Sequence, residues 1–347
     1  MPVGDGSDMA AALDIFKREL QHFQSLGRHF QVVSTIRHPN SGASVFSRPQ
    51  PPDVSSQFPL KRLVVLDSSF NPPTIAHQWL ATSALRDVWR KEGLRPAESR
   101  LLLLLAVNNA DKGVKPAAFE HRLTMMAAFA RDLLRSSEQT ESSIDKSPLP
   151  SDGGSSTLKG QPSVDSAEDL AIDIALTTFP YFHDKSAAIA SSEFYSGHGV
   201  ESPEQLFLAG FDTLIRIFNP KYYKPPVPEE GIYDAHETPM QSALDPFLGR
   251  ARLRITMRTD DDWGGKDEQL AYVDSMLHGD ELENVGGRKE WASRVELVEG
   301  IQADEGAVSS TLARNAAKQE DWKALRSSVS EPVATYIQSQ GLYSESS

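Results

Sequence analysis

Continuous apolar runs of strand length recur along the sequence, and segments with helical periodicity lie between the first of them. RLVVLD precedes a helical pattern at about 75–91, and LLLLLAV precedes one at about 119–135. Strands that are apolar throughout and alternate with helices are typical of a parallel sheet that is covered on both faces. The sequence therefore predicts an α/β fold. The predicted strands lie at 62–67, 101–107, 171–177, 205–210, 252–258 and 294–298.

Two segments differ in composition from the alternating strands and helices, one before them and one within them. Residues 9–26 have helical periodicity and residues 38–59 are rich in proline and serine, so we interpret 1–59 as an N-terminal helix and a linker or covering loop. The main domain then spans 60–343. Within it, 136–168 has almost no large apolar side chains and cannot bury enough surface to offset its ordering entropy. This composition predicts a disordered and dispensable insertion.

Cysteine content and charge exclude several classes of protein, because the chain has no cysteine and a net charge of −13. Without cysteine there is no disulfide, no thiolate metal site and no cysteine nucleophile. A strongly acidic chain binds nucleic acid or an anionic membrane poorly. No stretch approaches the roughly 18 to 20 apolar residues that cross a bilayer, and the N-terminus lacks the pattern of a secretory signal. We therefore expect a soluble cytoplasmic protein, with the nucleus open as a second compartment, that binds neither nucleic acid nor membrane.

The turn after the first predicted strand, DSSFNPPTIAH at 67–77, has the features of an anion site. Ligands of such sheets bind beyond the carboxyl ends of the strands. Thr74 is a suitable N-cap for the next helix, whose positive end then points at the crevice, and His77 lies in its first turn. Backbone N–H groups would face the same crevice from Ser68, Ser69, Phe70 and Asn71. A plain strand–turn–helix with a surface histidine explains this stretch equally well.

Polar residues also follow two of the later strands. Asn108 and Lys112 come after LLLLLAV, and a lysine there can balance phosphate charge, although a solvated loop lysine is the commoner explanation of such a residue taken alone. After QLFLAG, Gly210 permits close approach of the backbone to a ligand. Asp212 either accepts a hydrogen bond from a ribose hydroxyl or caps the following helix.

The segment GAVSSTLARN combines hydroxyl groups with an arginine. A helix is predicted to begin at about Ser310, and Arg314 lies one turn beyond Thr311 on the same face. Together with Ser309, these groups form either a second phosphate clamp or a capped helix with a solvated arginine. A further helical pattern, EPVATYIQSQGLY, follows. Each of these segments is a weak signal alone, but four of them around the strand ends of one sheet rarely coincide by accident.

The same segments, in order, resemble the motifs of the nucleotidylyltransferase superfamily, in particular its nicotinamide mononucleotide (NMN) adenylyltransferase branch. SSFNPPTIAH is similar to G-S-F-N-P-x-T-x-x-H, and NNADK, PAAFEHR, GFD and VSSTLAR are similar to the later motifs. The blocks LLLLLAVNNADK and GFDTLIRIFNPKYY most resemble the fungal promoter-of-filamentation group of that branch. The resemblance covers about 60–343 without the insertion, and it implies a Rossmann-like, doubly wound parallel sheet with helices on both faces.

This resemblance also implies a reaction, namely adenylyl transfer from ATP to NMN, which gives NAD and pyrophosphate. His77 would contact an α-phosphate oxygen, and Lys112 and Arg314 would contact the departing β- and γ-phosphates. Asp212 would hold the adenosine ribose, and Mg²⁺ would bridge the ATP phosphates with few protein ligands. The other motif residues implied to bind ATP or NMN are Ser68, Ser69, Phe70, Asn71, Thr74, Asn108, Gly210, Ser309, Ser310 and Thr311.

Two departures from the family pattern bear on the substrate. The family's first glycine falls on Ser68, which follows Asp67, and a carboxylate near phosphate is electrostatically unfavourable. The aromatic residue that stacks on nicotinamide has no clear counterpart, and the candidates are Tyr181, Phe182 and Trp263. The alternatives are therefore an ATPase of the same fold and a nucleotide-binding regulatory protein with weak or lost transfer activity. Whether the chain forms a homo-oligomer is open.

Overall fold

A computed structural model of the chain describes residues 5–38, 48–107, 117–142, 169–197, 201–223, 237–257, 264–300 and 308–344. Within these ranges, strands form one seven-stranded sheet in the order β1-β4-β3-β2-β5-β6-β7. β2 to β7 are parallel, and β1 pairs antiparallel with β4 at one edge. The strands are β1 (Phe30–Ile36), β2 (Arg62–Asp67), β3 (Ser99–Ala106), β4 (Ala171–Thr177), β5 (Glu204–Gly210), β6 (Ala251–Thr256) and β7 (Val295–Val298).

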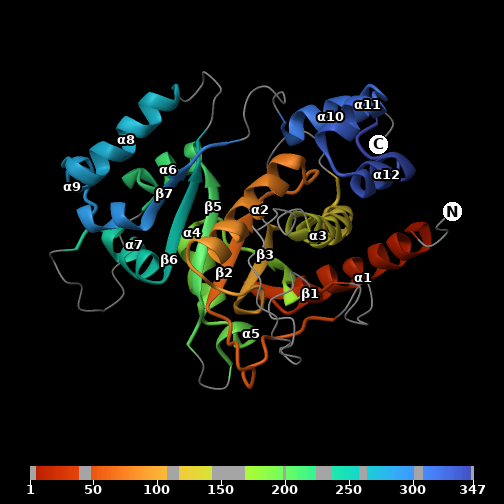
Figure 1. Cartoon of the computed structure of the whole chain (residues 1–347), viewed down its shortest axis with the longest axis horizontal. Helices are drawn as coiled ribbons and strands as arrows, with labels where there is room; N and C mark the ends of the chain where they lie inside the picture. Colours follow the sequence, from red (N-terminus) through yellow and green to blue (C-terminus); the bar gives the residue numbers. More distant parts are fainter. Residues whose placement is uncertain are drawn as a thin grey trace, which may run out of the picture.

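Helices cover both faces of this sheet (Figure 1). They are α1 (Asp5–Ser25), α2 (Ile75–Arg90), α3 (Phe119–Ser142), α4 (Phe182–Ala190), α5 (Glu193–Ser196), α6 (Phe211–Ile217), α7 (Pro239–Arg250), α8 (Lys266–His278), α9 (Glu281–Asn284), α10 (Ser310–Lys318), α11 (Trp322–Ser328) and α12 (Glu331–Ser339). Short 3-10 helices span Pro96–Glu98, Pro220–Tyr222 and Lys289–Arg294. None of the described helices is long and apolar enough to span a membrane.

The two faces of β2 show why an apolar strand is needed in this fold. Val64 and Leu66 belong to the core that includes α1, α2, α3 and α10 to α12, whereas Leu63 and Val65 belong to the core that includes α4 to α8. Successive side chains of a strand point to opposite faces, so a strand buried on both faces is a nearly continuous apolar run. The predicted Rossmann-like, doubly wound α/β fold is confirmed.

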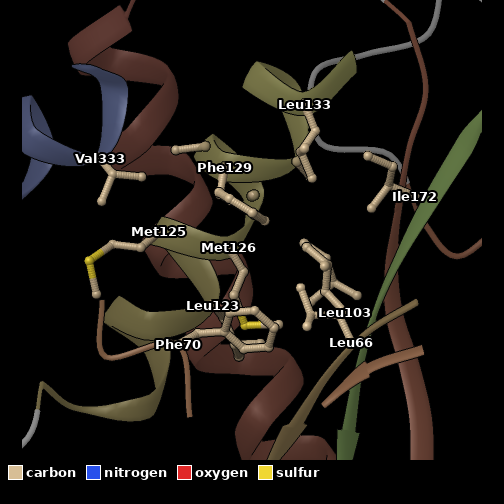
Figure 2. Close-up of a cluster of buried hydrophobic side chains, with 14 of the residues drawn as sticks. Leu66, Phe70, Leu103, Leu123, Met125, Met126, Phe129, Leu133, Ile172 and Val333 are labelled. Carbon is tan, nitrogen blue, oxygen red and sulfur yellow. The ribbon is translucent and has the colours of Figure 1, made fainter. Parts of the chain in front are cut away.

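The larger core lies between the sheet and α3. Figure 2 shows Leu66, Leu103 and Ile172 of the sheet turned toward side chains of α3 such as Phe129. The ring of Phe70, from the turn after β2, is fully buried in the same core. The turn is therefore anchored in the hydrophobic core through one of its own side chains.

The predicted strands and helices are all present, with ends that differ by a few residues, but β1 was not predicted. It buries Ser34 and Thr35, and Thr35 donates a hydrogen bond to Asp173 of β4 at 2.7 Å. A strand with buried polar residues lacks the apolar run that marks the others. The domain division at residue 60 stays a prediction, although β1 joins the same sheet as the later strands.

Helix α3 is longer than predicted, because it continues to Ser142 and so enters the segment 136–168. Extending an existing helix costs little for residues such as glutamate and glutamine, which have good helix propensity. The prediction of disorder is therefore wrong for 136–142. The rest of the predicted insertion, 143–168, lies outside the described residues.

The order of the strands also locates a crevice. The chain runs from β2 through β3 to β4 on one side, and then crosses to β5 on the other side of β2. The connections that leave β2 and β5 therefore diverge, and parallel α/β sheets bind ligands at such a switch point, beyond the carboxyl ends of the strands. The turn at 68–74 and Gly210 both lie at this edge.

Candidate active site

A cavity of about 540 Å³ lies at the switch point. Its walls include the ends of β2, β3 and β5, together with residues of α2, α3, α4 and α6. Five of the predicted catalytic and nucleotide-binding residues line it, namely Ser68, Ser69, His77, Gly210 and Asp212, and so do the stacking candidates Tyr181 and Phe182. The structure therefore brings the turn after β2 and the start of α6 together around one space.

The turn after β2 is held in an uncommon backbone conformation. Phe70 has a φ of +44°, in the left-handed region that a bulky residue rarely adopts. The next residue, Asn71, is buried, and its Oδ1 accepts hydrogen bonds from the backbone N–H of Ala117 at 3.2 Å and from the Tyr343 hydroxyl at 2.8 Å. Strained conformations persist where surrounding contacts over-determine them. Within the described residues, the Phe70 and Asn71 side chains are thus occupied in fixing the turn rather than in lining the cavity.

His77 is fixed by the start of its own helix. Its Nδ1 accepts the backbone N–H of Thr74, the N-cap of α2, at 3.0 Å and lies 2.8 Å from the Thr74 hydroxyl. A backbone N–H can only donate, so the ring hydrogen is on Nε2, which lies 2.8 Å from Ser68 Oγ. Burial lowers the pKa of His77 to about 4. At neutral pH, His77 is therefore an uncharged ring that offers an Nε2–H donor at the phosphate turn.

Helix α10 packs against the outer side of the same turn. Arg314 donates from Nη1 to the Asn71 carbonyl at 2.7 Å and from Nη2 to Thr311 Oγ1 at 3.1 Å. Ser310 Oγ donates to the Pro72 carbonyl at 2.8 Å. Ser309 caps the helix by accepting a backbone N–H. In the described part of the chain, none of these α10 residues lines the cavity. The hydrogen bonds from Ser310 and Arg314 therefore hold the turn on the side of α10.

Gly210 and Asp212 lie at the β5 side of the cavity. Gly210 is the N-cap of α6, and its extended backbone leads the chain past the cavity wall. Asp212 Oδ2 lies 3.5 Å from Arg216 Nη2 one turn further along the helix. A carboxylate at the cavity wall with an exposed cationic neighbour can still accept from a ribose hydroxyl.

Two buried cationic side chains in the cavity wall were missed by the sequence analysis. Arg122 of α3 donates from Nε to the Ala117 carbonyl at 2.7 Å, and its Nη1 lies 3.5 Å from the Ser69 carbonyl. Burial lowers its pKa. Lys185 of α4 places Nζ 2.5 Å from Asp67 Oδ2, with both side chains nearly inaccessible to solvent. The Asp67 carboxylate is therefore paired with a cation, which removes the electrostatic objection to its position before the turn.

Aromatic rings form another part of the cavity wall. Tyr181, which is 43% exposed, stacks on His183 with ring centroids 5.6 Å apart and an interplanar angle of 7°. His183 also meets the ring of Tyr223 at 5.6 Å. Phe182, a second candidate for stacking, packs against Phe207 of β5. Of the candidates in the described residues, Tyr181 has the most accessible ring for a planar ligand.

Several predicted residues lie outside the described ranges. Asn108 and Lys112 are among them, and so is Trp263. Their predicted roles stay predictions. The described ranges hold no group of three or more histidine, aspartate or glutamate side chains that could by itself bind a metal ion.

Comparison with known proteins finds a likeness in sequence and distant likenesses in structure. No model of a protein family matches the chain. A Schizosaccharomyces pombe protein described as a putative nicotinamide mononucleotide adenylyltransferase is 29% identical over 278 residues, which cover 80% of this chain and 84% of that protein. The resemblance to the NMN adenylyltransferase branch, first seen in the motifs, is confirmed by this likeness.

Two solved structures illustrate the structural matches. Plasmodium falciparum nicotinic acid mononucleotide adenylyltransferase complexed with APC has 13% identity and a TM-score of 0.41, over 82% of this chain and 97% of that one. Thermotoga maritima TmcAL bound with alpha-thio ATP has 13% identity and a TM-score of 0.33, over 81% of this chain and 56% of that one.

Proposed function

We propose that this chain transfers the adenylyl group of ATP to a pyridine mononucleotide, with NMN as the acceptor. A phosphate oxygen of NMN attacks the α-phosphorus of ATP, the bond from that phosphorus to the bridging oxygen breaks, and pyrophosphate leaves with the electron pair, giving NAD. The observation that carries this proposal is a single cavity whose wall includes the phosphate turn, a neutral His77 donor and the Tyr181 ring. The sequence likeness to the S. pombe protein supports the same reaction.

The phosphate turn suits the triphosphate of ATP. The Ser68 N–H, predicted to face the crevice, instead donates to the Leu104 carbonyl of β3 at 3.2 Å. In this proposal the later backbone N–H groups of the turn and the N-terminus of α2 form a site with partial positive charge, where anions bind well. The attacking phosphate is already anionic, so the reaction requires no general base. In this proposal His77 Nε2–H contacts an α-phosphate oxygen and the catalytic contribution is positioning plus stabilisation of charge.

The remaining residues of the proposed site either offset the charge of the phosphates or orient the substrate and the turn. Arg122 is a cation in the cavity wall beside Ser69, where it can meet the departing phosphates together with the predicted Lys112. Asp212 is proposed to hold the adenosine ribose. Arg314 is proposed to act by holding the turn, since it donates to the Asn71 carbonyl.

Mg²⁺ fits this site as an ion carried by ATP. The Asp67 carboxylate, which stands closest to the turn, is engaged by Lys185, so it offers little to a metal. When bound, Mg²⁺ would supply positive charge that offsets the charge of the phosphates. Protein side chains would add few ligands.

The decisive experiment incubates the purified protein with ATP, Mg²⁺ and NMN and measures NAD. Matched reactions contain nicotinic acid mononucleotide in place of NMN, or no acceptor. NAD formation with NMN preferred supports the proposal. Preference for nicotinic acid mononucleotide would correct the acceptor, and ADP plus phosphate without an acceptor would favour the ATPase alternative.

Arg314→Ala is expected to raise the KM for ATP by roughly 10- to 100-fold, because a charged hydrogen bond that holds the phosphate turn is worth about 1.5 to 3 kcal/mol. Steady-state kinetics at saturating NMN measures this change. Arg326→Ala is the matched control, since Arg326 pairs with Glu331 on the exposed surface of the C-terminal helices. An unchanged KM in the Arg314 variant would show that the turn does not depend on α10.

A further inference from the structure

We infer that Lys185 binds the phosphate of the acceptor mononucleotide, with Asp67 holding its ammonium group in place. This inference rests on the proposed function. Lys185 lies in α4, is 4% exposed, and lines the same cavity as the phosphate turn. Its Nζ is 2.5 Å from Asp67 Oδ2, at the end of β2. A buried lysine in a cavity wall is uncommon, and its pairing with a residue next to the turn needs an explanation.

The ammonium group retains hydrogen-bonding capacity. It carries three N–H donors, and within the described residues Asp67 is the acceptor that the structure gives it. Because Lys185 lines the cavity, an anion there can accept from the remaining donors. Removing a charged group from water is costly unless it is paired, so the Asp67 carboxylate keeps the ammonium charged while the cavity is empty of ligand.

The position of Lys185 matches the position at which the acceptor phosphate must lie. The Tyr181 ring comes from the preceding turn of the same helix, and the Lys185 N–H donates to the Tyr181 carbonyl at 3.1 Å. The ammonium group at the end of the Lys185 side chain pairs with Asp67, the residue directly before Ser68. Lys185 is thus linked through its backbone to Tyr181 and through its side chain to the residue that precedes the phosphate turn. A pyridine mononucleotide whose ring lies on Tyr181 would direct its phosphate toward this group.

Charge gives a reason for a cation at this place. The acceptor phosphate and the α-phosphate of ATP are both anionic and must come into contact for the reaction. His77 is a neutral donor, as its hydrogen bond to Thr74 requires, so it does not offset this repulsion. Arg122 lies beside the Ser69 carbonyl, next to the phosphate turn. Arg216, the other cation of the described cavity wall, is 58% exposed and lies 3.5 Å from Asp212. We therefore assign to Lys185, which is buried, the contact that offsets the charge of the incoming nucleophile.

The test compares Lys185→Met with the double variant Lys185→Met/Asp67→Asn. The double variant removes both charges, so it leaves no unpaired buried carboxylate and isolates the contact with substrate. Both variants are expected to raise the KM for NMN by roughly 10- to 100-fold, the range for loss of a hydrogen bond from a charged group, with less than about threefold change in the KM for ATP. Lys185→Arg keeps the charge and should recover part of the affinity.

A salt bridge at the other end of the same strand supplies the control. Lys61 Nζ lies 2.6 Å from Glu98 Oε1, next to the start of β2 and away from the cavity. Lys61→Met/Glu98→Gln should leave the KM for NMN unchanged. If the Lys185/Asp67 double variant instead has the wild-type KM for NMN, Lys185 is only the counter-ion of Asp67 and the inference is overturned.

The outcome also separates this inference from the proposed function. If the wild-type protein makes no dinucleotide, the proposed function fails, and calorimetric titration of NMN into the wild-type and variant proteins then decides the role of Lys185 without turnover. Weaker NMN binding by both variants at equal thermal stability supports the inference. Equal binding in all proteins, or no binding by any of them, overturns it.

Discussion

Replacing His77 with alanine is expected to lower kcat about 10²- to 10³-fold and to change the KM for ATP much less, the range seen when one donor of an oxyanion hole is removed. Negative charge shifts among the α-phosphate oxygens mainly in the transition state, and only interactions that strengthen there accelerate the reaction. The Nε2–H of His77 is fixed beforehand by the Thr74 N–H on the other ring nitrogen. The ring is therefore held in place before ATP binds, and the phosphate oxygen has only to replace or share the present acceptor of Nε2–H, Ser68 Oγ at 2.8 Å.

The low pKa of His77 also predicts how the effect of this substitution varies with pH. Burial lowers that pKa to about 4, so the ring stays neutral at pH values well above 4. An ordinary histidine, with a pKa near 6.5, would gain a proton between pH 7 and pH 5. The fold loss in kcat caused by His77→Ala should therefore be the same at pH 6 and at pH 8.

Stability must be measured alongside the kinetics, because the variant also leaves the Thr74 N–H without its acceptor. An unpaired buried donor costs about 1 to 3 kcal/mol, so the melting temperature should fall. Activity is therefore expressed per folded molecule. His278→Ala is the control, since His278 lies on the exposed side of α8 and outside the cavity wall. Full activity per folded His77→Ala molecule would assign His77 a structural role alone.

The fold was largely predictable because the central strands β2 and β3 carry a strong local signal. A strand buried on both faces is a nearly continuous apolar run, and Val64, Val65 and Leu66 satisfy two different cores at once. The edge strand β1 carries no such signal, because it buries Thr35 through a hydrogen bond to Asp173. Only the partner strand, far along the chain, explains that burial.

The site was predictable only where its residues share one short segment. The turn after β2 and His77 lie within ten residues of each other, and helix-capping rules connect them. Lys185 and Asp67 are separated by 118 positions, and no spacing rule joins two such residues. Arg314 was expected on phosphate, but its guanidinium donates to the Asn71 carbonyl because α10 packs against the turn. That packing depends on tertiary structure, which the local pattern does not contain.

Replacing Asp173 with asparagine is expected to destabilise the protein by about 3 to 5 kcal/mol, the cost of removing one partner from a buried ion pair. Asp173 is fully buried in β4, where its carboxylate lies 3.1 Å from the Arg100 guanidinium. It also accepts the Tyr195 hydroxyl at 2.9 Å and the Thr35 hydroxyl at 2.7 Å. The asparagine can keep one acceptor, but it leaves the Arg100 charge buried without a counter-charge.

Chemical denaturation measures this effect as a lower midpoint concentration, and a matched surface variant calibrates it. Lys91→Met removes an exposed i,i+4 pair with Asp87, for which about 0.3 to 0.5 kcal/mol is expected. Arg100→Met/Asp173→Asn removes both charges and should recover a large part of the loss, since hydrophobic replacements of buried ion pairs are often tolerated. If Asp173→Asn is as mild as Lys91→Met, the Arg100 charge finds another partner and the network contributes little. If the double variant is no more stable than Asp173→Asn, the loss comes from the hydroxyl contacts of Thr35 and Tyr195 rather than from an unpaired charge.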